Sequence, residues 1–149
     1  MTWAPMMLID GNPMAPSRIL LTIVALAAAT AAAGCGSDST SPPDVVRAWS
    51  KAVNRGDNES AARLFGPRVK FVAGDYVTVV RGHERAVAFN AGLGWCGPIV
   101  RLVAKGTDVT AQFALATRAA GRCTAGRERG SVFFRIRHGK IVLFDQIGA

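Results

Sequence analysis

The chain has 149 residues and a formal net charge of +8; half of its residues are hydrophobic and 19% are charged. This balance excludes a chain that is disordered throughout, because such chains are poor in apolar residues. Three cysteines and two histidines are too few for a zinc module or a disulfide-dense mini-protein, so no metal site is expected.

The N-terminal region is typical of a targeting signal. Residues 19–33 are uncharged and mostly apolar, and they follow Arg18. A run of this length is short for a membrane-spanning helix and suits the apolar part of a signal peptide. Residues 14–18 form a normal n-region by themselves, so Met14 is an alternative to Met1 as the start of translation.

The end of this run, Ala-Ala-Gly-Cys at residues 32–35, resembles a bacterial lipobox. The resemblance implies that Cys35 is acylated on sulfur and anchors the mature chain to the outer face of the cytoplasmic membrane. The alternative is an ordinary secretory signal cut near Ala33, which would release the protein from the cell. We therefore divide the chain into a leader (1–34), a flexible tether (35–43) and one domain (44–149).

Hydrophobic periodicity predicts an α+β domain. Helices are expected over 44–55, from Asp57 as N-cap to Gly66-Pro67, and over 82–93. Strands are expected over 69–72, 77–81, 99–105, 109–118, 131–137 and 140–147. His138-Gly139 fits a two-residue hairpin turn.

The turn at His138-Gly139 suggests a register for the last hairpin. With strict alternation, Phe134 lies opposite Leu143, and Val132 lies opposite Asp145. Asp145 then falls on the apolar face of the sheet. The same register places Phe133 opposite Phe144 on the outside, where an exposed aromatic pair would favour a homodimer.

The order of elements is similar to that of the nuclear transport factor 2-like superfamily, including its SnoaL-like group. The resemblance rests on Val-Val-Arg-Ala-Trp at 45–49, Asn-Arg-Gly-Asp at 54–57, Arg-Gly-His-Glu at 81–84 and His-Gly-Lys-Ile at 138–141. It implies a cone in which a strongly curved antiparallel sheet wraps three helices and leaves a pocket. The pocket walls expected here are Trp49, Phe89, Phe113, Phe134, Leu143 and Asp145.

The family that this sequence resembles contains enzymes and non-catalytic binding domains, so the fold does not choose between them. The general base of ketosteroid isomerase comes from the first strand, and residues 69–72 contain no acid. Asp145 is the strongest candidate for an acid or base, because apolar neighbours raise a carboxyl pKa. Tyr76 and His83 are its candidate partners.

Two further features concern cofactors and cross-links. The G-x-G-x-x-G pattern at 92–97 follows a helix and opens a strand, which is the reverse of a dinucleotide site, so no cofactor is expected. Cys96 and Cys123 flank two strands joined by a hairpin and are predicted to form a disulfide outside the cytosol.

The basic residues are scattered along the sequence, which argues against nucleic acid and fits contact with anionic headgroups or wall polymers. The leading hypothesis is a lipid-anchored, non-catalytic domain that binds a small apolar ligand or dimerises. The alternative is an isomerase, dehydratase or hydrolase that uses Asp145. A third possibility is a partner-binding domain whose cone is filled.

Overall fold

The computed structural model describes residues 40–124 and 126–148. The predicted leader, Cys35 and the tether up to residue 39 lie outside the described residues. By its contacts Gly36–Ala149 is one compact unit, and every described core residue belongs to it. Within the described part of the chain, no helix has the length and apolar character needed to cross a bilayer.

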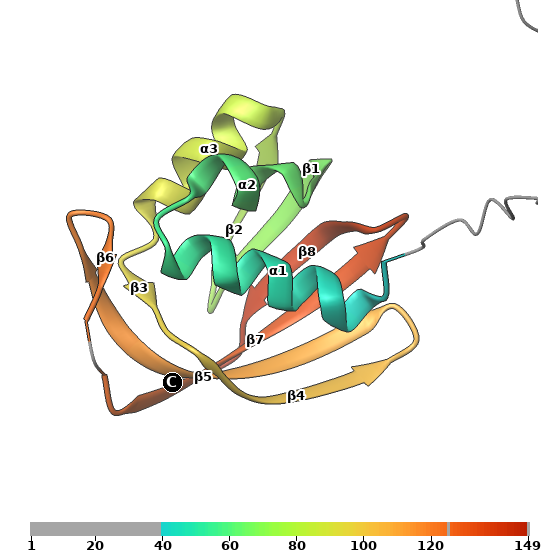
Figure 1. The fold of residues 1–149 in the computed structure, drawn as a ribbon. Helices are drawn as coiled ribbons and strands as arrows, with labels where there is room; N and C mark the ends of the chain where they lie inside the picture. The colour runs from blue at the N-terminus through green and yellow to red at the C-terminus, as the bar shows by residue number, and fades with distance from the viewer. Residues whose placement is uncertain (1–39, 125, 149) are drawn as a thin grey trace, which may run out of the picture. The chain divides into compact units, whose positions relative to one another are not determined.

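Three helices cover one side of a sheet (Figure 1). They are α1 (Pro42–Asn54), α2 (Asn58–Arg63) and α3 (His83–Gly92). The predicted stripe of α1 is buried, with Trp49 fully enclosed. Asp57 is the N-cap of α2, as predicted. Hydrogen bonds from the Ser60 hydroxyl and backbone N–H hold the pKa of the Asp57 carboxyl below its ordinary value.

The strands follow in chain order, with two short additions to the prediction. They are β1 (Phe65–Ala73), β2 (Tyr76–Arg81), β3 (Trp95–Cys96), β4 (Ile99–Lys105), β5 (Asp108–Ala119), β6 (Arg122–Cys123), β7 (Glu128–Arg137) and β8 (Lys140–Gln146). The second helix ends at Arg63 rather than at Gly66-Pro67. Phe65 is drawn into β1 because it pairs with Ile141 of β8, a contact with no local signal in the sequence.

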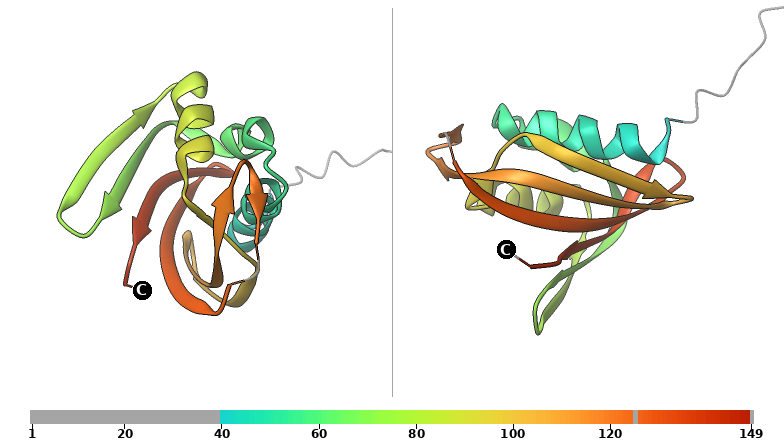
Figure 2. Two further views of the ribbon diagram at one scale, coloured as in Figure 1. Left: turned by 90° about the vertical axis from the view of Figure 1, so that its left-hand side faces the viewer. Right: turned by 90° about the horizontal axis from the view of Figure 1, so that it is seen from below.

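The sheet is strongly curved and mixed rather than wholly antiparallel. Its main path runs β2-β1-β8-β7-β5-β3, with β4 and β6 also paired to β5. The pair β1–β8 is parallel, which corrects the expected all-antiparallel sheet. The sheet bends around the helices, and the β1–β2 hairpin extends away from the rest of the domain (Figure 2). The expected cone is confirmed.

The last hairpin contains an extra residue that changes which side chains face inward. His138 and Gly139 both have positive φ, as the predicted turn requires. Ile136 lies opposite Ile141 as expected, but Arg135 then pairs with Leu143 and Phe134 with Phe144. Val142 is therefore the extra residue of a β-bulge, and the alternation of β8 reverses after it.

Candidate functional site

The interior of the cone is filled by aromatic rings. Trp49 lies at the centre, with ring centroids 5.3 Å from Phe134, 5.2 Å from Phe144 and 6.3 Å from Phe113. All four side chains are fully buried. Trp95, Phe71 and Phe89 pack around this group. Edge-to-face pairs at these separations add to the stabilisation from burial alone.

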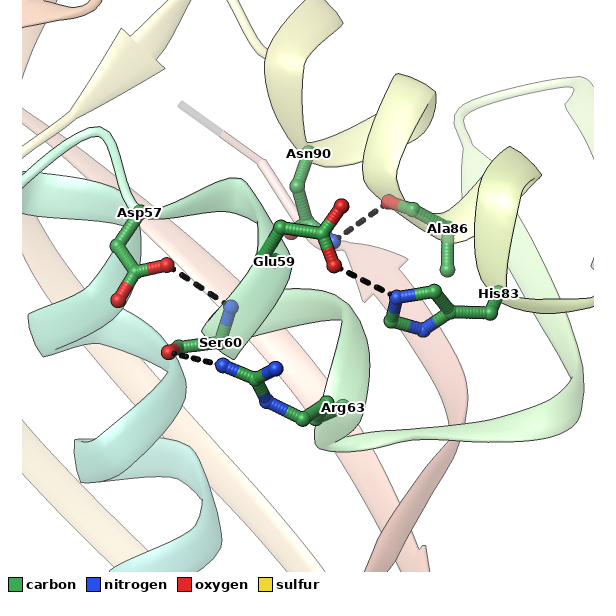
Figure 3. A network of polar contacts seen from close by, with 7 residues as sticks. All are labelled: Asp57, Glu59, Ser60, Arg63, His83, Ala86 and Asn90. Carbon is green, nitrogen blue, oxygen red and sulfur yellow. Dashed lines mark hydrogen bonds and ion pairs between the residues drawn. The ribbon is translucent and has the colours of Figure 1, made fainter.

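Trp49 has one polar partner, which the sequence analysis did not identify. Its indole Nε1 donates to Oδ1 of Asn90 at 2.8 Å, and Asn90 Nδ2 donates to the Ala86 carbonyl at 2.8 Å. Figure 3 shows the second of these bonds within α3. Asn90 is fully buried, and the two bonds satisfy one donor and one acceptor of its amide. The pair holds α1 against α3. In the sequence, the only sign that Asn90 is buried was its position one helical turn after the inward-facing Ala86.

The pocket expected inside the cone is closed. In 40–124 and 126–148, none of five well-formed cavities is lined by Trp49, Phe113 or Phe134, three of the predicted wall residues. Two recesses beside Trp95 and Leu115 have volumes of about 120 and 270 Å³. Sites for small molecules usually measure about 300–1,000 Å³, so both recesses are smaller than this range.

Asp145 and Leu143 lie on the opposite side of the sheet from these rings. Asp145 pairs with Phe133 and Leu143 with Arg135, and all four are half-buried. The expectation that both residues line the cone is wrong. The bulge at Val142 turns Phe144 inward and Asp145 outward. Strict alternation had placed an aromatic ring in water and a carboxylate in the core, and that unfavourable arrangement was itself a sign of the extra residue.

The two candidate partners of Asp145 are not brought to it. Tyr76 pairs with Ala73, which pairs with Gln146, so Tyr76 belongs to the inner face while Asp145 belongs to the outer one. His83 begins α3, where its Nε2 lies 2.7 Å from Oε2 of Glu59 (Figure 3). Both side chains of this contact are at least half exposed, so it stabilises the domain little. Among the described residues, neither Tyr76 nor His83 forms a hydrogen bond or ion pair with Asp145.

The exposed aromatic pair expected between Phe133 and Phe144 is also absent. Phe144 is fully buried and lies opposite Phe134, with ring centroids 5.0 Å apart. Phe133 alone remains on the outside, half-buried beneath the Arg135 guanidinium, whose carbon lies 5.7 Å from the ring centroid. Any contact through this surface must therefore use neighbours other than Phe144.

We call the side of the sheet that faces away from the helices the outer face. Its central row crosses from β4 to β2 and is apolar except for one Thr and one carboxylate. The row consists of Val103, Thr110, Phe133, Asp145, Val72 and Val77. Val103 is 52% exposed and Val77 is 53% exposed.

Charges of both signs flank the central row of the outer face. Nε and Nη2 of Arg135 donate to the two carboxylate oxygens of Asp108 at 2.8 and 3.0 Å. The hydrogen bond from Arg135 holds the pKa of the Asp108 carboxyl below its ordinary value. This pair therefore presents a positive and a negative group side by side next to the apolar row.

Cys96 and Cys123 form the predicted disulfide, with Cα atoms 5.8 Å apart. The bridge ties β3 to β6 across β5, since Cys96 pairs with Ala116 and Cys123 with Arg118. Arg118, also missed from the sequence, donates to the Asn90 carbonyl and, at 2.6 Å, to Oδ1 of Asn58. Partial burial lowers the pKa of this guanidinium. These contacts bind the helices to this end of the sheet.

The glycine-rich stretch at 92–97 has a structural explanation. Gly97 has φ +141°, and a Cβ there would lie 1.9 Å from the Ala114 carbonyl oxygen. Asn54 bonds to both polar groups of Gly97, accepting from its N–H at 2.8 Å and donating to its carbonyl at 3.0 Å. Gly97 is needed for close contact with β5. Across the described residues, no three His, Cys, Asp or Glu side chains gather as metal ligands.

The architecture defines a class of protein: three helices packed into a curved, unclosed sheet. The chain belongs to the SnoaL-like domain family, whose profile matches residues 46–144. Comparison with the curated proteins finds no match.

Solved structures with the same fold are distant in sequence. An NTF2-like protein of unknown function from Cytophaga hutchinsonii has a TM-score of 0.58 and 16% identity, over 73% of this chain and 90% of the other. A putative ketosteroid isomerase from Kribbella flavida has a TM-score of 0.58 and 20% identity, over 72% of this chain and 77% of the other. A protein with a ketosteroid isomerase-like fold from Catenulispora acidiphila, in complex with trimethylamine, has a TM-score of 0.59 and 18% identity. The match covers 72% of this chain and 86% of the other. Similarity at this level shows the fold alone.

Proposed function

We propose that the chain is an exported, lipid-anchored and non-catalytic SnoaL-like domain that binds a second copy of itself through the outer face. The observation that carries the proposal is the filled cone. Trp49, Phe113, Phe134 and Phe144 occupy the volume where a member of this fold would hold a substrate or an apolar ligand. Binding of another molecule must then take place at the surface of the domain.

The outer face suits a second copy because it combines exposed valines with charges of both signs. In a two-fold contact the same surface must complement itself, so an acid of one copy has to meet a base of the other. Asp108 and Arg135 flank the apolar row and supply both. The enzyme alternative lacks such support, since Asp145 lies on this outer face and not in a closed pocket.

Sedimentation of the domain at tens of micromolar tests the dimer. We expect the wild type to sediment as a dimer, and a variant that carries Val103→Lys and Phe133→Lys to be monomeric, because the contact would bury two charges without partners. The matched control is Val100→Lys, which changes an exposed valine of the same strand beside α1. A wild type that is strictly monomeric would end the dimer proposal.

Palmitate labelling tests the anchor independently. We expect labelled wild type and complete loss of label in Cys35→Ser, because the sulfur of Cys35 would carry the acyl chain. The double variant Cys96→Ser, Cys123→Ser serves as the control, since it removes the other two cysteines and should keep the label. An unlabelled wild type would refute the anchor.

A further inference from the structure

A groove of about 660 Å³ lies between α1 and β4. Its sides are basic: Arg47, Lys51 and Arg55 come from α1 and its C-cap, and Arg101 comes from β4. Within the described residues that line it, none is acidic. The three residues from α1 are spaced four apart, so they form one stripe about 12 Å long on the helix surface.

The floor of the groove is apolar. We use the word floor for the apolar side chains of β4 that line the groove, Ile99, Leu102 and Val100, the last of which is 44% exposed. Ser50 and Asn54 of α1 add polar groups to the lining. A soluble anion such as free phosphate would be attracted by the basic side chains, but contact with the apolar floor would add nothing to its binding free energy. A phospholipid headgroup region offers phosphodiester charge together with an apolar glycerol and upper acyl segment, and it matches both parts of the groove.

The position of the groove along the chain supports the same ligand. Six residues, 36–41, separate Cys35 from the first residue of α1. Fully extended, such a segment spans about 20 Å. If Cys35 is anchored, the basic stripe of α1 is confined close to the headgroups, and the short tether raises its effective concentration there.

One ion pair lies at the start of the stripe. Arg47 Nη1 lies 3.0 Å from Oδ1 of Asp44, and both side chains are more than half exposed. An exposed pair of this kind is weak and exchanges readily for another anion. Arg47 therefore remains available to a phosphodiester together with Lys51, Arg55 and Arg101.

From this combination of charge, apolar floor and tether length, we infer that the α1–β4 groove binds the headgroups of anionic phospholipids and orients the domain on the membrane. The inference deepens the proposed anchoring, yet it concerns different residues from Cys35 and from the outer face. A failure here leaves the anchor and the dimer untouched, and each of those is tested separately.

The experiment measures binding of the unit Gly36–Ala149, which contains the whole described core and lacks the acylation site, to vesicles. Vesicles of equal phosphatidylglycerol and phosphatidylcholine are compared with pure phosphatidylcholine. We expect binding only to the former, weakening as salt rises. The variant Arg47→Gln, Lys51→Gln, Arg55→Gln should bind roughly 100-fold more weakly, about fivefold for each charge removed near an anionic surface.

The control variant is Arg127→Gln, Arg129→Gln, Arg137→Gln, which removes the same charge from exposed positions outside the groove. It should change binding less than about threefold. Equal losses in the two variants, or no binding to the anionic vesicles, would overturn the inference. Displacement by millimolar inorganic phosphate at constant ionic strength would also overturn it, because the ligand would then be free phosphate. Circular dichroism confirms that each variant is folded.

Discussion

Phe144→Ala is expected to lower the free energy of unfolding by about 3 to 5 kcal/mol, the cost of removing a fully buried aromatic side chain. Phe144 contacts Trp49, Phe134 and Phe71 at the centre of the cone, so its loss leaves a cavity that these rings cannot close without leaving their positions. Urea denaturation of the variant, followed by tryptophan fluorescence, measures the loss.

The adjacent strand supplies the matched control for Phe144. Phe133→Ala removes the same side chain from a half-buried position on the outer face and should cost about 1 kcal/mol or less when measured on the monomer. Strict alternation through the hairpin places both Phe133 and Phe144 on the outside, so it would predict similar losses for the two variants. Equal losses in the two variants, or a larger loss for Phe133, would show that β8 has no extra residue at Val142.

Removal of the Cys96–Cys123 bridge is the second change with a large expected effect. The two residues are 27 positions apart, and closing a loop of this length stabilises a domain by about 3 to 4 kcal/mol in the chain-entropy account. We expect the double variant Cys96→Ser, Cys123→Ser to lose about 3 kcal/mol, equivalent to roughly 12 to 24 °C in the melting temperature of a domain of this size. Thermal denaturation with and without reductant measures it.

Reductant provides an internal control for the disulfide. It should lower the melting temperature of the wild-type Gly36–Ala149 unit and leave that of the double variant unchanged, since no other cysteine is present in this unit. If reductant leaves the wild type unchanged, the cross-link contributes nothing to stability and the junction of β3, β5 and β6 is held by its hydrogen bonds alone.

Most of the fold could be predicted from local patterns. The apolar stripe of α1, the Asp57 cap, the turn at His138-Gly139 and the strand at 99–105 all depend on residues close together in the sequence. The disulfide could be predicted as well, because one hairpin brings its two flanks to the same end of the sheet. The family resemblance required only the order and spacing of these elements, and the profile match to 46–144 confirms it.

The candidate site was harder to predict because it depended on one uncertain register. The run Ile-Val-Leu-Phe at 141–144 is apolar throughout, so alternation cannot say which of its members faces inward. Inserting Val142 as an extra residue exchanges the two faces of everything that follows. Asp145 moved from the expected pocket to the outer face for this reason alone, and Phe144 moved from the expected dimer contact to the core.

The sequence by itself determined the type and order of the elements, the cap, the turn and the cross-link, because each follows from backbone preferences or from side chains that are neighbours along the chain. Only the tertiary structure decided that β1 joins β8 in parallel, that aromatic rings from distant segments fill the cone, and that four separated basic residues line one groove. These outcomes depend on how distant segments share a limited volume. That competition is settled by packing and burial over the whole domain, and no single segment carries a signal for it.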